Sequence, residues 1–221
     1  MDSTNLSHSH IAQAWQDFLN HITTMVVIFA ATIGIYILDL SIYFAIILVG
    51  QVVGSAELQP LFEVAANIIT IPLDIALSLV GILFSAVPAV YYSQDKRVGP
   101  KEAFSLLYRR FWRYLAAGIV YTVFCTLGLL FCIVPGLIVG LAMPIYVDRV
   151  FNSDQDPVQA LSSSINALFK SGKGWEFMGI QLLTGFISLV LIVCTCGLGI
   201  LAAPAGLFYV QRIGRLKGVI R

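Results

Sequence analysis

Two aspartates lie inside long apolar runs, where a carboxylate is costly and often marks an ion or proton path. Asp39 lies 17 residues after Ile22, and Asp74 lies 18 residues before Tyr92. As helices rising ~1.5 Å per residue, both runs place their carboxylate ~26 Å from one membrane boundary. The spacing predicts an acidic pair at matched depth on adjacent helices. The pair could share a proton along an ion path, or it could be hydrated near the outer interface or cap a helix break there.

Other reactive side chains are too sparse to predict catalysis, a metal site or a cofactor. His8, His10 and His21 are too few for a metal site and indicate a solvated N-terminus. No nucleophile–base pair, phosphate-binding glycine loop or metal-binding Glu/His motif is present. We therefore expect a protein that is not an enzyme.

Four cysteines, Cys125, Cys132, Cys194 and Cys196, lie in apolar runs. Cysteine is a common small residue of buried positions, which is the role we expect. A disulfide from Cys132 to Cys194 or Cys196 is the alternative.

The composition predicts an all-α, polytopic integral membrane protein. Hydrophobic residues make up 58% and charged residues 11% of the chain, with a mean hydropathy of +0.88. A soluble domain of this size needs far more charge to cover its surface. We expect residues 1–221 to form a single membrane domain.

Six apolar segments approach the roughly 20 residues that a membrane-spanning helix needs. They predict three hairpins, with reversals near residues 51–63, 133–136 and 196–199. The first span begins near Ile22 and the second ends near Tyr92; the others cover about 114–134, 137–150, 175–196 and 198–212.

The positive charges all fall on one side of these hairpins, which predicts that this side, with both termini, faces the cytoplasm. We expect a bacterial cytoplasmic (inner) membrane, although a thylakoid or other internal membrane is equally compatible. The positive residues are Lys96, Arg97, Lys101, Arg109, Arg110, Arg113, Arg149, Lys170, Lys173, Arg212, Arg215, Lys217 and Arg221.

The chain also repeats, which predicts three units over about 5–95, 100–151 and 156–214. Each unit opens on an amphipathic interfacial helix that leads into a hairpin, and each hairpin ends on a tyrosine motif. The openings are Gln13-Ala14-Trp15, Glu102-Ala103-Phe104 and Gln159-Ala160-Leu161; the tyrosines are Tyr91, Tyr146 and Tyr209. A shift of 63 residues also superposes Trp112 on Trp175 and Gly136 on Gly199.

The interfacial helices carry the residues that we expect to contact lipid headgroups. In the first helix, Ile11, Trp15, Phe18 and Ile22 follow the spacing of one helical face. Asp156 is a predicted N-cap of the third helix. The predicted headgroup contacts are Arg109, Arg110, Arg113, Trp112, Lys170 and Lys173; simple filling of the interface is the alternative.

Prolines mark the predicted turns and breaks. Pro135 and Gly136 permit a tight reversal. Pro144 and Pro204 interrupt the short fourth and sixth spans. These two prolines could shape the packing, or they could mark broken helices around a substrate path.

The first span is too long for the bilayer. Residues 22–50 extend ~43 Å as a helix, whereas the hydrocarbon core measures ~30 Å. The excess, residues 40–50, must tilt, lie along the outer interface or pack against another subunit. We therefore expect self-association or a membrane-protein partner.

Residues 134–183 resemble a set of bacterial membrane proteins. These include the membrane domain that accompanies some glycerophosphoryl diester phosphodiesterases and the YciC family. The shared pattern is Val134-Pro135-Gly136, Met143-Pro144-Ile145-Tyr146, Asp156-Pro157-Val158-Gln159-Ala160-Leu161 and Lys170-Ser171-Gly172-Lys173-Gly174-Trp175. The resemblance implies a six-helix inner-membrane domain without an assigned activity. The soluble phosphodiesterase barrel is absent from this sequence.

Two functions remain open. The first is a non-enzymatic scaffold, assembly or lipid-interacting subunit that self-associates and has membrane lipids as partners. The second is a small transporter or channel that uses Asp39 and Asp74. A lipid-modifying enzyme is less favoured because polar catalytic residues are missing at the interface. Basic clusters follow the topology, so no nucleic-acid partner is expected.

Overall fold

The fold, a computed structural model, is all-helical. The structure describes residues 3–54, 58–131, 133–170 and 172–220, with the backbone alone for residues 3–9. Five helices in this part of the chain are long and apolar enough to cross a membrane, namely α2, α3, α5, α6 and α8. The helices are α1 (Ser3–Asn20), α2 (Ile22–Val53), α3 (Gln59–Gln94), α4 (Pro100–Arg109), α5 (Phe111–Phe131), α6 (Ile133–Asn152), α7 (Pro157–Phe169), α8 (Gly172–Cys194), the 3-10 helix η2 (Leu198–Leu201) and α9 (Ala203–Leu216).

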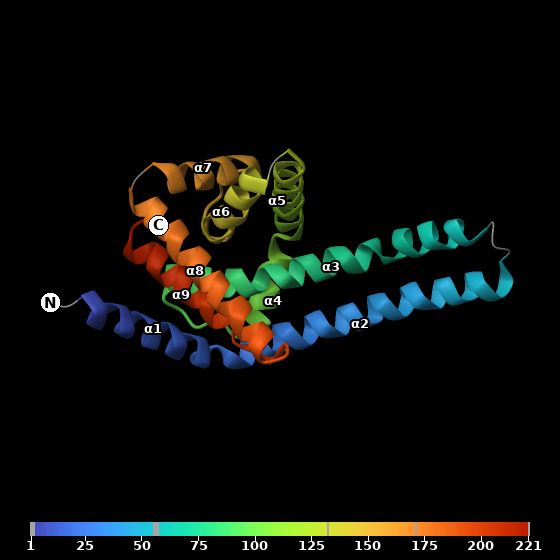
Figure 1. The fold of residues 1–221 in the computed structure, drawn as a ribbon, viewed down its shortest axis with the longest axis horizontal. Coiled ribbons are helices and arrows are strands. Elements are labelled where there is room, and N and C mark those ends of the chain that lie inside the picture. Colours follow the sequence, from blue (N-terminus) through green and yellow to red (C-terminus); the bar gives the residue numbers. More distant parts are fainter. Residues whose placement is uncertain (1–2, 55–57, 132, 171, 221) are drawn as a thin grey trace.

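Helices α2 and α3 pack along each other and extend far from the rest of the molecule (Figure 1). The rings of Phe29 and Phe84 lie 6.3 Å apart near one end. Near the other end, a Cβ on Gly50 would lie 2.6 Å from the Phe62 ring, so glycine permits the close approach there. A residue of α2 therefore faces a residue of α3 when their two numbers add to about 113, as those of Phe29 and Phe84 do.

The segment predicted as a sixth span, residues 198–212, is divided between η2 and α9. Pro204 lies at the start of α9, where its missing N–H costs no helical hydrogen bond. Pro135 likewise lies in the first turn of α6, which begins at Ile133. The prediction of a turn at residues 133–136 was therefore wrong, because these residues are already helical. Pro144 lies inside α6.

Gly136 and Gly199 have the same surroundings. A Cβ on Gly136 would lie 2.9 Å from the backbone nitrogen of Leu129, and one on Gly199 would lie 2.7 Å from that of Ile192. In both cases the neighbour is the residue seven positions earlier. These glycines therefore allow α6 to approach α5, and η2 to approach α8, at van der Waals limits.

Helices α3, α6 and α9 contact one another and form the centre of the molecule. The three short amphipathic helices pack around this centre. Helix α4 contacts the two helices that precede it, α2 and α3, and α7 likewise contacts α5 and α6. Helix α1 contacts α9 at the other end of the chain, so these contacts follow a cyclic order. Ala14, Ala103 and Ala160, which the predicted repeat aligns, are all buried at these contacts. The repeat remains a prediction, and this shared placement supports it.

A polar network fastens α1 to the other helices. Tyr91 and Tyr92 donate hydrogen bonds of 3.0 and 2.7 Å to the Asp17 carboxylate, and Arg212 forms an ion pair with it at 3.2 Å. His21 is buried and accepts from the Val98 N–H at 3.3 Å, so its other ring nitrogen donates to the Asp17 carbonyl at 2.8 Å. The prediction of a solvated N-terminus was therefore wrong for His21.

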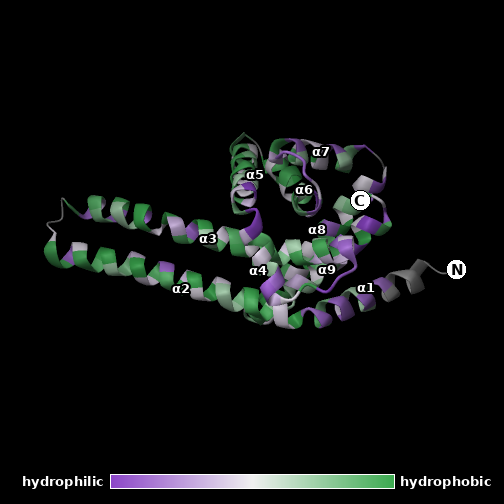
Figure 2. Ribbon diagram, turned by 180° about the vertical axis from the view of Figure 1, so that it is seen from behind, coloured by the Kyte–Doolittle hydropathy of each residue, from purple (hydrophilic) through white to green (hydrophobic). Residues whose placement is uncertain are grey.

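Figure 2 shows mostly hydrophobic residues along α2, α3 and α5 and more hydrophilic residues along α1. Trp15, Trp112 and Trp175 are all exposed. Trp112 and Trp175 lie in the first turns of α5 and α8, and Trp15 lies in α1, seven residues before α2 begins. Tryptophan favours the headgroup level of a bilayer, so these rings are suited to the membrane boundary.

Candidate functional site: an apolar cavity between the helices

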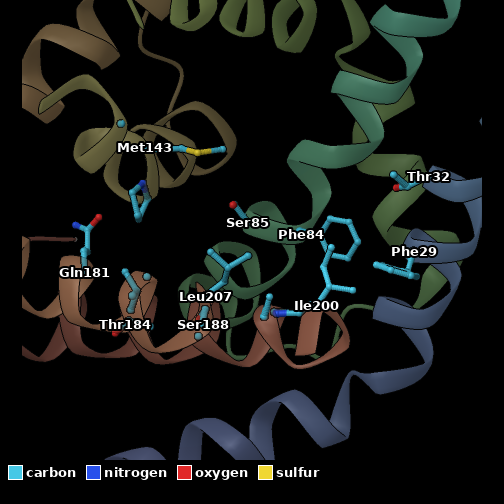
Figure 3. A pocket seen from close by; sticks show the side chains of 17 residues that line it. Phe29, Thr32, Phe84, Ser85, Met143, Gln181, Thr184, Ser188, Ile200 and Leu207 are labelled. Carbon is cyan, nitrogen blue, oxygen red and sulfur yellow. The ribbon is translucent and has the colours of Figure 1, made fainter. Parts of the chain in front are cut away.

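A cavity of about 560 Å³ lies where α2, α3, α6, α8, η2 and α9 converge (Figure 3). Ligand pockets commonly have volumes of roughly 300–1,000 Å³, so this space is large enough for a small organic ligand or a lipid chain. Its lining comprises Phe29, Thr32, Phe84, Ser85, Gly140, Met143, Pro144, Gln181, Thr184, Gly185, Ser188, Ile200, Ala203, Pro204, Gly206, Leu207 and Val210.

The walls are built from one face of α8 and from residues of α2, α3, α6, η2 and α9. Gln181, Thr184, Gly185 and Ser188 follow the spacing that places residues on one side of a helix. Pro144 and Pro204, predicted as helix interruptions, both line this cavity. The two prolines therefore border one shared space, an arrangement that their sequence separation does not reveal.

The side chains that line the cavity are uncharged, which suits an uncharged ligand. Its lining contains no Asp, Glu, Lys, Arg or His, and the polar groups are hydroxyls and one amide. The Thr32 and Thr184 hydroxyls donate to the Ile28 and Ile180 carbonyls of their own helices at 2.9 and 2.8 Å. The described walls therefore offer uncharged hydrogen-bonding groups only.

The predicted acidic pair lies outside this cavity. Asp39 and Asp74 stand at the same level of the α2–α3 pair by its register, but the side chains have different surroundings. Asp74 is exposed and lines a smaller cavity of about 260 Å³ between α3 and α5. The Asp39 Oδ1 atom is buried and has no hydrogen-bond partner among the residues that the structure describes.

The predicted headgroup arginines are partly engaged by the protein itself. Arg110 and Arg113 both pair with Asp154, Arg113 at 3.3 Å. Arg113 also donates to the carbonyls of Ser153 and Gln155. The hydrogen bond from Arg110 holds the pKa of the Asp154 carboxyl below its usual range.

The other predicted headgroup residues lie near the helix starts and ends. Arg109 is the last residue of α4, and Trp112 is 79% exposed at the start of α5. Lys170 and Lys173 are exposed on either side of the α7–α8 boundary. Lys170 also lines a polar cleft of about 770 Å³ beneath α7, with Asn152 and Ser163.

A buried ion pair beside this cleft was missed by the sequence reasoning. Asp148 is 3% exposed and pairs with Arg215, and Asn152 donates to it at 2.8 Å. Asp148 lies in the tyrosine motif that ends the second predicted hairpin, which was the available signal. The pair joins α6 to α9 at their polar ends.

The cysteine prediction was wrong for two of the four residues. Cys194 and Cys196 are exposed, and Cys125 is half-buried; all three are free thiols. Cys132 lies outside the described residues. Within the described chain, no group of three His, Cys, Asp or Glu residues is placed to hold a metal ion.

Comparison with known proteins adds no assignment. No protein-family model, no curated protein and no solved structure matches this chain.

Proposed function

We propose that this chain is a non-enzymatic membrane protein that binds a lipid or another apolar molecule between its helices. The observation that carries the proposal is the 560 Å³ cavity, whose walls come mainly from the candidate membrane spans α2, α3, α6 and α8 and hold no ionisable side chain. Apolar walls favour hydrocarbon over water, because removing apolar surface from water is the dominant gain on binding.

The proposed topology has six spans as three hairpins, with η2 and α9 together forming the sixth. Both termini face the cytoplasm of a bacterial inner membrane, supported by the one-sided positive charges. The proposal extends to the resemblance to the phosphodiesterase membrane domain and the YciC family, which rests on residues 134–183. Self-association is part of the same proposal and is supported by the exposed, overlong α2 and α3.

Two glycines on α8 provide a matched test of lipid binding. Gly185 lines the cavity, whereas Gly179 does not, and a Cβ at either position meets no atom within 4 Å. Gly185→Leu therefore fills the cavity, and Gly179→Leu adds the same side chain elsewhere on α8.

The measurement is native mass spectrometry of protein extracted gently from its own membrane. We expect a stoichiometric lipid on the wild type and Gly179→Leu, and at least a tenfold lower bound fraction on Gly185→Leu. Equal lipid content in the two variants, or none in the wild type, would overturn the proposal. The same spectra report whether the chain self-associates or carries a second protein.

The transporter alternative has weaker support. It needs Asp39 and Asp74 along one path, but Asp74 borders the separate cavity against α5, and neither carboxylate lines the apolar cavity of about 560 Å³.

A further inference from the structure

The amide of Gln181 is a polar group of the apolar cavity with an unmet hydrogen bond. Its Nε2 atom is buried and has no partner within the described chain. The side chain extends from α8 toward the cavity (Figure 3). A buried donor without a partner is costly, so such a group calls for an acceptor that the protein itself does not provide.

Gln211, which is buried, has a different arrangement. Gln211 donates from Nε2 to the Pro144 carbonyl at 2.9 Å, and it does not line the cavity. Gln181 has no corresponding carbonyl. Gln211 thus fastens α9 to α6 through its Nε2, although its Oε1 is also buried without a partner among the described residues. Gln181 differs because its unpartnered amide lines the cavity.

Pro144 adds a complementary acceptor to the same cavity. Proline has no N–H, so the Gly140 carbonyl, one helical turn earlier, loses its intrahelical donor. Gly140 lines the cavity together with Pro144 and Gln181. The cavity therefore offers an amide donor and a backbone acceptor within otherwise apolar walls.

We propose that Gln181 binds an uncharged oxygen of the ligand, so that the cavity selects long-chain lipids carrying a carbonyl or hydroxyl over pure hydrocarbon. The absence of ionisable lining residues excludes a charged group at this point, because an unpaired charge in such walls would be far too costly. This inference rests on the proposed lipid-binding function and specifies the chemistry of its ligand.

The test compares three probes of equal chain length: octadecane, octadecanol and octadecanoic acid methyl ester. Each competes against radiolabelled methyl ester on the full chain purified in detergent. We expect wild-type protein to prefer the ester or the alcohol over octadecane by about five- to tenfold, the range of one net hydrogen bond. An ester preference identifies a carbonyl ligand; an alcohol preference identifies a hydroxyl that also reaches the Gly140 carbonyl.

Gln181→Leu is the decisive variant, because it keeps a side chain of similar size and removes the amide. It should abolish the preference while leaving octadecane binding unchanged or tighter. Gln181→Asn controls for the amide, which the shorter side chain retains, and should keep part of the preference.

The failures are distinguishable. If no probe binds the wild type, the proposed function itself fails. If all three bind equally to the wild type, or if Gln181→Leu keeps the preference, lipid binding stands and the role of Gln181 is refuted. Thermal unfolding of each variant establishes that a loss of binding does not reflect a loss of fold.

Discussion

Arg212 of α9 lies 3.2 Å from the carboxylate of Asp17 in α1, although 195 residues separate them. The two phenols of Tyr91 and Tyr92 donate to the same carboxylate. Asp17 thus joins α1, α3 and α9. This contact links the first amphipathic helix, α1, to the last helix of the chain, α9.

Removing the Asp17 carboxylate should release α1. Asp17→Ala leaves two hydroxyls and a guanidinium without their acceptor, so we expect a loss of about 2 kcal/mol in the free energy of unfolding. Asp17→Asn keeps one acceptor and should cost less. Thermal unfolding in detergent measures both, with Gln16→Ala, an exposed neighbour on α1, as the control. Equal stability of Asp17→Ala and the control would show that the network does not hold α1.

Gly136 and Gly199 should tolerate no side chain. Each has a backbone nitrogen under 3.0 Å from the position of a Cβ, so Gly136→Ala and Gly199→Ala should each destabilise the fold by about 1–3 kcal/mol. Gly179→Ala lies in open space within a helix and should stabilise it by about 0.5–1 kcal/mol. Denaturant titration of the three variants checks the order; a stabilising Gly136→Ala would contradict the close approach of α5 and α6.

Neutralising the acidic pair should leave lipid binding intact. Asp39 and Asp74 lie outside the proposed lipid cavity, so Asp39→Asn with Asp74→Asn should retain wild-type lipid content. An intramembrane charge is costly, so the double variant should also melt at a higher temperature. Proton flux into proteoliposomes that requires either aspartate would instead favour the transporter.

The Asp154 ion pairs should make stability depend on acid pH. The pKa of Asp154 is lowered by its hydrogen bond to Arg110 and by the charge there. A carboxyl with a lowered folded pKa contributes stability above its unfolded pKa and loses it as the pH falls through the folded value. The stability advantage of the wild type over Asp154→Asn should therefore be full at pH 7, begin to fall near the ordinary aspartate pKa of about 3.9, and be lost only as the pH drops through the lower folded pKa. Because Asp154 is exposed, added salt should reduce the same advantage; an advantage that persists at low pH would contradict the role of the pair.

Local signals in the sequence predicted several elements closely. Helix α2 begins at Ile22, as expected, and Asp156 caps α7 by accepting from the Val158 N–H at 3.2 Å. Both features depend on neighbouring residues, so the local pattern suffices. The apolar character of the five long helices likewise follows from composition alone.

Contacts between distant segments could not be predicted in this way. The stripe predicted for α1 included Ile11, Trp15 and Ile22, which remain 43–53% exposed, while Ala14 and His21 are buried. An alanine gives no hydrophobic signal, yet its small size allows α1 to approach α9. The cavity could not be predicted for the same reason, because its lining comes from six helical elements that are distant in the sequence. Of these lining residues, the sequence pattern singled out Pro144 and Pro204.

The contact between α1 and α9 also places a demand on biosynthesis. At roughly 5–20 residues per second, about 10–40 s separate the synthesis of Asp17 from that of Arg212. During this interval α1 has no α9 to bind, and its buried face must be held by the bilayer or by the insertion machinery. Helix α1 is therefore synthesised before α9 and can make this contact only after α9 has emerged. A ribosome that stalls before α9 leaves a chain in which α1 cannot make this contact.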